Sequence, residues 1–252
     1  SKMNSGNAIG KVIAVMSGKG GVGKSSVSSL LAVELARRGK KVGLMDTDIT
    51  GPSIPTMFGV IDKKPEIASS GIVPVKSPKL GIEIISINLL LEQPEQPIIW
   101  RGPLLSKAIQ ELWEEVAWSE LDILILDLPP GTGDIPLTVM QSIPLQGVVI
   151  VSSPQDLALL IVKKAINMVY QLSKPILGLV ENMSFLTCPN CGQQIFLFGK
   201  PRGEEISVEL GIPFLGYLPV DPEFSHHCDL GTIEGFESPY SKSLVDRLGK
   251  LI

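Results

Sequence analysis

The sequence is poor in cysteine, in aromatic residues and in long apolar segments. Only 3 of its 252 residues are cysteine, which is too few for the disulfide framework of a small secreted protein. No apolar run reaches the roughly 20 residues that a membrane span requires, and the first residues lack the apolar core of a signal peptide. The formal net charge of -4 gives no overall positive field to attract nucleic acid or anionic lipid. These deficits predict a cytoplasmic protein that binds no nucleic acid, with membrane binding disfavoured.

What the sequence does contain is an alternation of short apolar runs with amphipathic segments of helical length. Nearly continuous apolar runs are typical of strands buried on both faces, and the segments between them suit crossover helices. The pattern predicts an α/β fold in three layers, with a doubly wound, mostly parallel sheet between helices. We expect a flexible N-terminus over residues 1–10 and a single domain over 11–252. The predicted strands are 11–17, 41–46, 121–127, 147–153, 175–182 and 213–219, with weak strands near 82–87 and a loop over 62–79; the predicted helices are 24–38, 103–117, 155–170, 203–210 and 239–251.

A glycine-rich segment follows the first predicted strand and opens the first predicted helix. It reads GKGGVGKS over residues 18–25 and fits the phosphate-binding pattern G-x-x-x-x-G-K-[ST] in the strand-to-helix context that gives this pattern meaning. Lys24 is expected to reach the β and γ phosphates, Ser25 to ligate Mg²⁺ and Ser26 to contact the α phosphate. The sequence therefore predicts a P-loop NTPase fold whose phosphate-binding residues are Gly18, Lys19, Gly20, Gly21, Val22, Gly23, Lys24, Ser25 and Ser26.

Lys19 is a second lysine in this segment and completes the pattern K-G-G-x-G-K-[ST]. In this respect the sequence resembles the deviant Walker A ATPases, the group of MinD and ParA. The resemblance implies that Lys19 reaches across a nucleotide-sandwich dimer to the phosphates held by the other subunit. A cation supplied in this way stabilises transition-state charge and makes hydrolysis depend on dimerisation. The alternative is a solvated loop lysine.

Three aspartates end predicted strands near the expected phosphate site. Asp46 and Asp48 follow the second strand, where a switch loop would face the γ phosphate, and Asp127 occupies the Walker B position that holds Mg²⁺ through water. The resemblance implies that Asp48 orients the attacking water, and we expect Asp46 to support the Mg²⁺ shell or the loop. The alternative for the first pair is two turn aspartates that cap the next segment.

The sequence also favours adenine over guanine as the bound base. The tetrapeptide [NT]-K-x-D, with which guanine-specific NTPases recognise the base, follows none of the late predicted strands. The resemblance to the deviant Walker A group implies that Asn182, Pro219 and Asp221 flank adenine. A strand-end asparagine and a Pro-Asp turn are the alternatives.

Two of the cysteines, Cys188 and Cys191, form a C-x-x-C-G turn within a loop over residues 184–200. Their spacing lets both sulfurs face one metal, but two thiolates do not complete a site. Two from each subunit of a homodimer would give four thiolates, enough for a four-iron cluster or a tetrahedral zinc. Cys228 follows His226 and His227 in what we interpret as a loop without function.

Longer blocks of sequence resemble, in order, the Mrp family of iron-sulfur cluster carriers, which includes ApbC-like proteins. The blocks are SGKGGVGKS, DTDITGPSIPTMFG, WRGPLLSKAIQEL, LDLPPGTGD, SSPQDLAL, ENMSFLTCPNCG and PFLGYLPVDP, from about Lys11 to Gly231. The resemblance implies a homodimer that holds a bridging, labile cluster at the C-x-x-C pair, passes it to apo iron-sulfur proteins and hydrolyses ATP slowly. The cysteine-rich N-terminal extension of some members is not in the sequence, so no second cluster is expected. Zinc at the same cysteines remains open.

Two other functions are compatible with parts of the sequence. A MinD- or ParA-like positioning ATPase is supported by the last predicted helix, whose apolar face flanked by lysine and arginine is typical of membrane-surface helices. The alternative for this helix is docking on the sheet. An ATP-gated electron donor like the nitrogenase iron protein is disfavoured, because that protein takes its cluster ligands from two separate loops.

Overall fold

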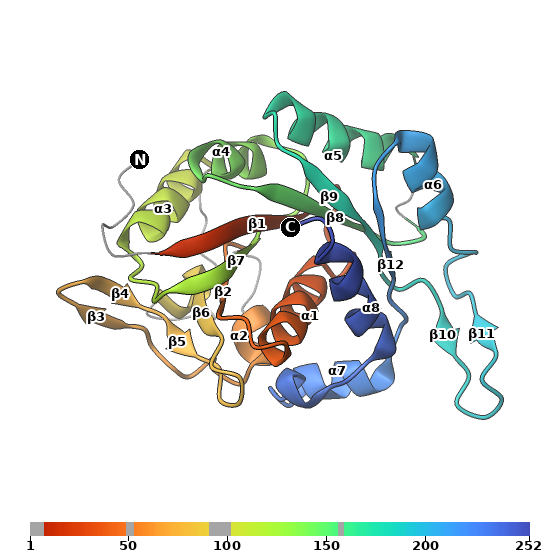
Figure 1. Cartoon of the computed structure of the whole chain (residues 1–252), viewed down its shortest axis with the longest axis horizontal. Helices are drawn as coiled ribbons and strands as arrows, with labels where there is room; N and C mark the ends of the chain where they lie inside the picture. The colour runs from red at the N-terminus through yellow and green to blue at the C-terminus, as the bar shows by residue number, and fades with distance from the viewer. Residues whose placement is uncertain (1–7, 49–52, 91–101, 156–158) are drawn as a thin grey trace.

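The computed structural model describes residues 8–48, 53–90, 102–155 and 159–252, and its centre is an eight-stranded sheet (Figure 1). The strand order is β12-β9-β8-β1-β7-β2-β6-β5, and every neighbouring pair is parallel except β5 with β6. This arrangement confirms the predicted doubly wound sheet. The strands are β1 (Ile9–Ser17), β2 (Val42–Asp46), β5 (Val75–Lys76), β6 (Glu83–Ser86), β7 (Leu121–Asp127), β8 (Gly147–Ser152), β9 (Ile176–Glu181) and β12 (Phe214–Tyr217).

Helices cover both faces of the sheet and complete three layers (Figure 1). α3, α4 and α5 pack on one face, and α1 and α8 pack on the other. Alternate side chains of β1 enter the two cores: Ala14 and Met16 face the first group of helices, and Ile13 and Val15 face the second. The continuous apolar runs of the sequence therefore reflect burial on both faces. The helices are α1 (Lys24–Arg37), α2 (Ser53–Met57), α3 (Gly102–Glu115), α4 (Asp134–Ser142), α5 (Leu159–Gln171), α6 (Gly203–Leu210), α7 (Pro222–Asp229) and α8 (Pro239–Leu248), with 3-10 turns at Ile87–Leu90 and Ile233–Gly235.

The structure differs from the predicted elements in several places, and its helices α2 and α4 are not among the predicted ones. β1 begins at Ile9, which pairs with Leu121, so this strand starts two residues before the predicted strand 11–17. The predicted loop over 62–79 is wrong: it contains β5 and an antiparallel pair, β3 (Glu66–Ala68) and β4 (Gly71–Val73). The predicted loop around residues 226–228 is helix α7. β3, β4 and α7 are short and have no buried residue, so they have no continuous apolar run to identify them.

The last helix docks on the sheet instead of presenting its apolar face to a membrane. Leu244, Val245 and Leu248 of α8 are buried in the core that α1 also covers. Within the described ranges, no helix has the length and apolar character that crossing a bilayer would require. The feature that supported a membrane-positioning ATPase is thus part of the core.

Candidate functional site

The glycine-rich segment forms a phosphate-binding loop between β1 and α1. Gly21 and Gly23 have φ values of 83° and 77°, a left-handed conformation that glycine adopts without strain. A side chain at Gly23 would also collide with the amide of Asn182. The N-terminus of α1 opens onto a cavity of about 350 Å³, where backbone N–H groups and the helix dipole favour an anion. Its lining comprises Ser17, Gly20, Gly21, Gly23, Lys24, Ser25, Ser26, Asp48, Ser53, Met57 and Pro130.

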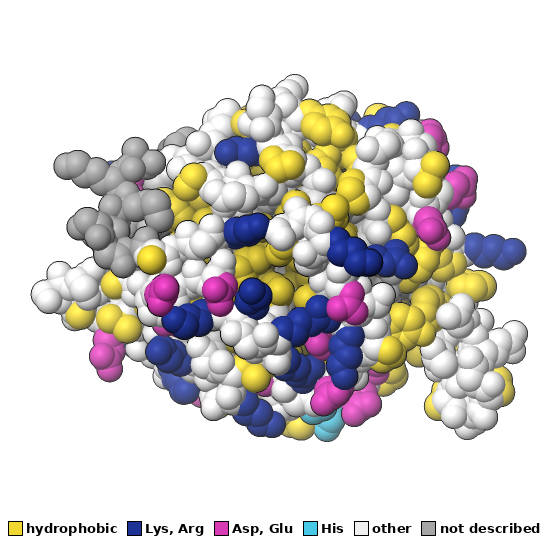
Figure 2. Space-filling view, in the orientation of Figure 1, with side chains coloured by type: hydrophobic (Ala, Val, Ile, Leu, Met, Phe, Trp, Pro, Cys, Tyr) yellow, Lys and Arg dark blue, Asp and Glu magenta, His cyan; other side chains and the backbone are white. Residues whose placement is uncertain are grey.

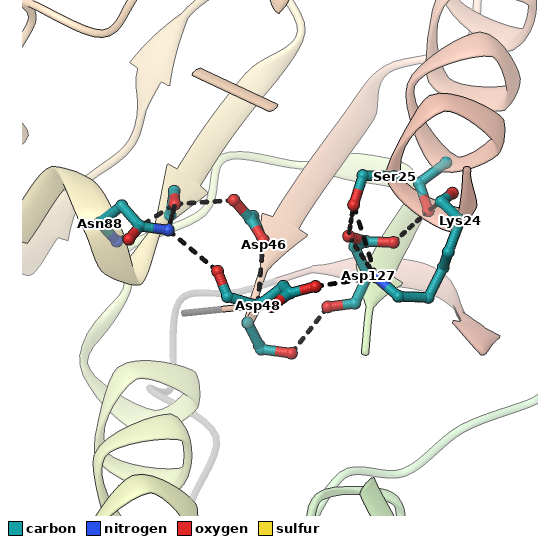
Figure 3. A network of polar contacts seen from close by, with 9 residues as sticks. Lys24, Ser25, Asp46, Asp48, Asn88 and Asp127 are labelled. Carbon is teal, nitrogen blue, oxygen red and sulfur yellow. Dashed lines mark hydrogen bonds and ion pairs between the residues drawn. The ribbon is translucent and has the colours of Figure 1, made fainter. Parts of the chain in front are cut away.

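Asp127, at the end of β7, is the central acceptor of this site (Figure 3). Its Oδ2 accepts hydrogen bonds from Lys24 Nζ at 2.8 Å and from Ser25 Oγ at 2.6 Å. Its Oδ1 accepts one from Ser28 Oγ at 2.6 Å. Lys24 and Asp127 are both buried, so their charges compensate each other away from water. The predicted Walker A lysine and serine and the Walker B aspartate thus lie together.

Asp46 and Asp48 lie beside this network at the end of β2 (Figure 3). Asp48 Oδ2 is 3.7 Å from Lys24 Nζ, so the second aspartate faces the phosphate-binding loop. Asp46 is fully buried and accepts hydrogen bonds from Ser86 Oγ and from the Asp48 N–H. Burial, with the neighbouring charge of Asp127 as the second cause, raises the pKa of Asp46 to about 8. The Asp46 carboxyl is therefore harder to ionise than an exposed aspartate.

The side chain of Lys19 lies on the exposed part of the loop, in contrast to buried Lys24. The two lysines of the segment therefore have different surroundings. An exposed position suits a lysine that reaches outward and equally a solvated one.

Of the three residues expected at adenine, Asn182 contacts the phosphate loop, and Pro219 and Asp221 lie between β12 and α7. Asn182 follows β9, is buried and donates from Nδ2 to the carbonyl of Val22 at 3.0 Å. Pro219 is half-buried between β12 and α7. Asp221 caps α7: its Oδ1 accepts from the N–H groups of Glu223 at 2.9 Å and Phe224 at 3.4 Å. The Asp221 carboxylate thus already has partners within its own helix.

The cysteines lie in a hairpin made by β10 (Leu186–Thr187) and β11 (Gln194–Ile195), which projects from the body of the protein (Figure 1). The Gly192 N–H donates to the carbonyl of Cys188 at 2.9 Å, and Gly192 has a left-handed φ of 72°. Hydrogen bonds from the backbone N–H groups of Cys191 and Asn190 lower the pKa of the Cys188 thiol. A tight turn that stabilises a thiolate fits a metal ligand.

The hairpin carries apolar side chains that are open to solvent (Figure 2). Ile195, Phe196, Leu197 and Phe198 are exposed to between 38% and 51%. Throughout the described ranges, no cluster of three or more His, Cys, Asp or Glu side chains could hold a metal ion. His226 is exposed, His227 bonds Thr232, and burial raises the pKa of Cys228 to about 11.

Comparison with known proteins identifies the family. Residues 8–250 match the ParA family described as NUBPL iron-transfer P-loop NTPase. The chain belongs to this family. An iron-sulfur cluster carrier protein of Clostridium perfringens is 45% identical over 254 residues, covering 97% of this chain and 88% of that protein. The protein of the same name from Methanocaldococcus jannaschii is 47% identical over 220 residues, covering 87% and 76%. The predicted resemblance is therefore confirmed.

Solved structures agree with this assignment. A nucleotide-binding protein of Archaeoglobus fulgidus, in complex with ADP and containing cobalt, superposes with a TM-score of 0.83 at 47% identity, covering 91% of this chain and 90% of that one. The cell-division ATPase MinD of Pyrococcus furiosus gives a TM-score of 0.69 at 20% identity, covering 96% and 100%. The second likeness shows the shared fold alone. The P-loop NTPase fold expected from the NUBPL-family sequence is confirmed.

Several polar residues of the site were not predicted from the sequence. Ser28 bonds Asp127 from the second turn of α1, and Asn88 donates from Nδ2 to the carbonyl of Asp48 at 2.9 Å. Glu181, at the end of β9, is fully buried. The available signal was a polar residue within or directly after an apolar run, which is unexpected in a core unless it has a partner. The segments at residues 49–52, 100–101 and 156–158, which belong to predicted blocks, lie outside the described residues.

Proposed function

We propose that this protein is an ATP-hydrolysing carrier that holds an iron-sulfur cluster between two copies of the chain and passes it to apo iron-sulfur proteins. The observation that carries the proposal is the presence, in one NUBPL-family chain, of a two-lysine phosphate loop and a projecting hairpin with two cysteines. Relatives at 45% to 47% identity bear the name iron-sulfur cluster carrier protein.

In the nucleotide site, the side chains that phosphoryl chemistry would use lie around one cavity. The N–H groups of the loop and Lys24 Nζ would bind the phosphates, and Ser25, Asp127 and Asp46 would hold Mg²⁺ and its water shell. Mg²⁺, when bound, neutralises charge on the β and γ phosphates. Lys24 and Ser25 must leave Asp127 to make these contacts. Asp48 would orient the attacking water, and Asn182, Pro219 and Asp221 would flank the adenine ring.

Hydrolysis would require a second copy of the chain. Lys19 is exposed at the mouth of the loop, where it could reach a γ phosphate held by a partner and stabilise the transition state. If ATP hydrolysis requires this contact, it is slow in separate protomers. ATP turnover would thus report dimerisation.

The metal site would also be completed by the second copy. Cys188 and Cys191 supply two thiolates on an exposed turn, and two copies about a two-fold axis supply four. Four thiolates suit a [4Fe–4S] cluster, which is the cargo, and suit tetrahedral zinc equally by number. The apolar side chains beside the cysteines offer a contact surface for recipient apoproteins.

Anaerobic reconstitution with iron and sulfide tests the cargo. We expect wild-type protein to gain visible absorption, about two irons per chain for a shared four-iron cluster, and the mass of a dimer. Cys188→Ala/Cys191→Ala should gain none of these. Cys228→Ala is the matched control, because this half-buried thiol lies on α7 outside the hairpin, and it should behave as wild type.

Two outcomes of this experiment would contradict the proposal. If the double variant binds iron and dimerises as well as wild type, the bridging cluster is excluded. If only zinc binds to the wild-type cysteines and no cluster forms, the hairpin is a zinc site and the carrier function fails.

A further inference from the structure

The end of β9 contacts the phosphate loop on one side and the cysteine hairpin on the other. Asn182 Nδ2 donates to the Val22 carbonyl, and the next residue, Met183, has a left-handed φ of 57°. A residue other than glycine rarely adopts this conformation, so the surrounding contacts must hold it. Only five residues separate Asn182 from Cys188. A shift of the loop at Val22 or Gly23 would therefore act on the chain entering the hairpin.

The chain that leads into the hairpin, residues 183–187, is hydrogen-bonded to the segment after β12. The Leu218 N–H donates to the carbonyl of Glu181 at 2.9 Å, and the Ser184 N–H donates to the carbonyl of Leu218 at 3.0 Å. The Val220 N–H donates to the carbonyl of Phe185 at 2.8 Å. This segment contains Pro219, which we place beside adenine. Both segments proposed to contact the base are thus bonded to the entry of the hairpin.

The exit of the hairpin is fastened by the side chain of Glu181. Its Oε2 accepts hydrogen bonds from the N–H groups of Arg202 at 3.1 Å and Gly203 at 2.5 Å, at the start of α6. A Cβ atom at Gly203 would lie 2.7 Å from this oxygen, so the approach leaves no room for a side chain. Between these fastenings, residues 189–200 are exposed. The position of the cysteine turn therefore depends on how its two ends are held.

We propose that Glu181 is the positioning residue that couples nucleotide occupancy to metal binding at Cys188 and Cys191. The inference rests on the proposed function and adds the route by which the two sites communicate. Movement of Asn182 or of residues 218–220 on nucleotide binding displaces the entry, and the Glu181 carboxyl transmits that displacement to the exit at residues 202–203. By thermodynamic linkage, metal binding must change nucleotide affinity by the same factor.

The acceptor oxygen of Glu181, and not its charge, makes this connection. Burial raises the pKa of Glu181 to about 7, so the group is partly protonated near neutral pH, and either form offers an oxygen to two N–H groups. Glutamine offers the same acceptor, whereas alanine offers none. The two substitutions consequently separate the hydrogen-bonding role from the charge.

The coupling can be measured with Co²⁺, whose thiolate complexes absorb visible light, titrated with and without Mg²⁺ and ADP. In wild type we expect ADP to change the Co²⁺ dissociation constant by a factor of about 5 or more. In Glu181→Ala this factor should fall toward one, while ADP and Co²⁺ each still bind. Glu181→Gln should retain it. Glu205→Ala, which removes an exposed carboxylate from the same helix start, is the matched control and should also retain it.

A second variant covers the case in which Glu181→Ala fails to fold. Gly203→Ala keeps glutamate at position 181 but forces its carboxyl away from the start of α6. This variant should therefore lower the coupling factor as well. Undiminished coupling in a folded Glu181→Ala or Gly203→Ala protein would overturn the inference and leave the carrier function standing. So would a wild type that binds both ligands without coupling. A wild type that binds no metal at its cysteines would instead refute the proposed function.

Discussion

At the scale of single residues, Asp127 is the shared acceptor of Lys24, Ser25 and Ser28. Removing Lys24 or Asp127 leaves the other charge buried without its partner, a change that typically costs several kcal/mol of stability. Variants at these two positions therefore test nucleotide binding only when circular dichroism and thermal unfolding show that the chain still folds. Asp48 is a better probe of the chemistry, because the ion pair between Lys24 and Asp127 remains when Asp48 is replaced.

Asp48→Asn should abolish turnover and preserve binding. The amide retains the size of the side chain but cannot accept a proton from the attacking water, and general-base contributions of this kind amount to about 10²-fold or more in kcat. Phosphate release and ATP affinity, measured on the same preparation, test this expectation. Asp62→Asn changes an exposed aspartate in the turn after α2 and should alter neither quantity. Full turnover in Asp48→Asn would remove this residue from the mechanism.

Glu181 makes folding stability depend on pH. Its pKa is raised from 4.5 to about 7 in the folded protein, so the unfolded chain loses the proton at lower pH than the folded chain does. Folding therefore loses stability as pH rises from 4.5 to 7 and changes little from this source above pH 7. Thermal unfolding of wild type and Glu181→Gln at pH 5 and pH 8 tests the assignment. The Tm of the variant minus the Tm of wild type should be higher at pH 8 than at pH 5. An equal difference at both pH values would contradict the assignment.

At the scale of elements, the cysteine hairpin depends on the turn that holds its two sulfurs. Gly192 has φ of 72° and donates to the Cys188 carbonyl, so alanine at this position must adopt a left-handed conformation that costs about 1 kcal/mol. We expect Gly192→Ala to weaken Co²⁺ binding several-fold while leaving ATP binding intact. Gly199→Ala is the matched control, because Gly199 has φ of 94° in the same hairpin region but lies outside the C-x-x-C turn. Equal loss of affinity in both variants would show that general hairpin strain, and not the turn, controls the metal.

The elements that position the site are the ones that the sequence predicts best. β1, β2, β7 and β9 are buried on both faces, so their apolar runs are unambiguous, and the residues that end them occupy the same edge of a parallel sheet. β3, β4 and α7 are short and lack such a run. The contact of Glu181 with Gly203 joins residues 22 positions apart across a projecting hairpin, which no local pattern encodes. Pattern therefore predicts the phosphate site, and only the tertiary structure shows its connection to the cysteines.

At the scale of the whole molecule, the two lysines of the phosphate loop are proposed to contact nucleotides bound to different chains of the dimer. In that dimer, Lys24 would bind the nucleotide of its own chain, and exposed Lys19 would contact the nucleotide of the partner. Lys24→Ala should abolish nucleotide binding in its own chain, and Lys19→Ala should bind ATP without hydrolysing it. Each variant alone is therefore expected to be inactive. In a mixed dimer, each chain supplies the lysine that the other chain lacks.

Mixing the two variants in equal amounts should restore hydrolysis. Half of the randomly formed dimers pair the two variants, and each mixed dimer has one complete site, in which the Lys19→Ala chain binds ATP and the Lys24→Ala chain supplies Lys19. Activity should reach about a quarter of the wild-type value if the variants associate equally. Mixing Lys19→Ala with a Lys19→Ala/Lys24→Ala chain is the control, because the same dimers form without any Lys19, and it should stay inactive. Phosphate release over a range of mixing ratios measures the effect. A mixture that remains inactive while forming mixed dimers would show that Lys19 acts within its own chain, and the dependence of hydrolysis on a partner would then fall.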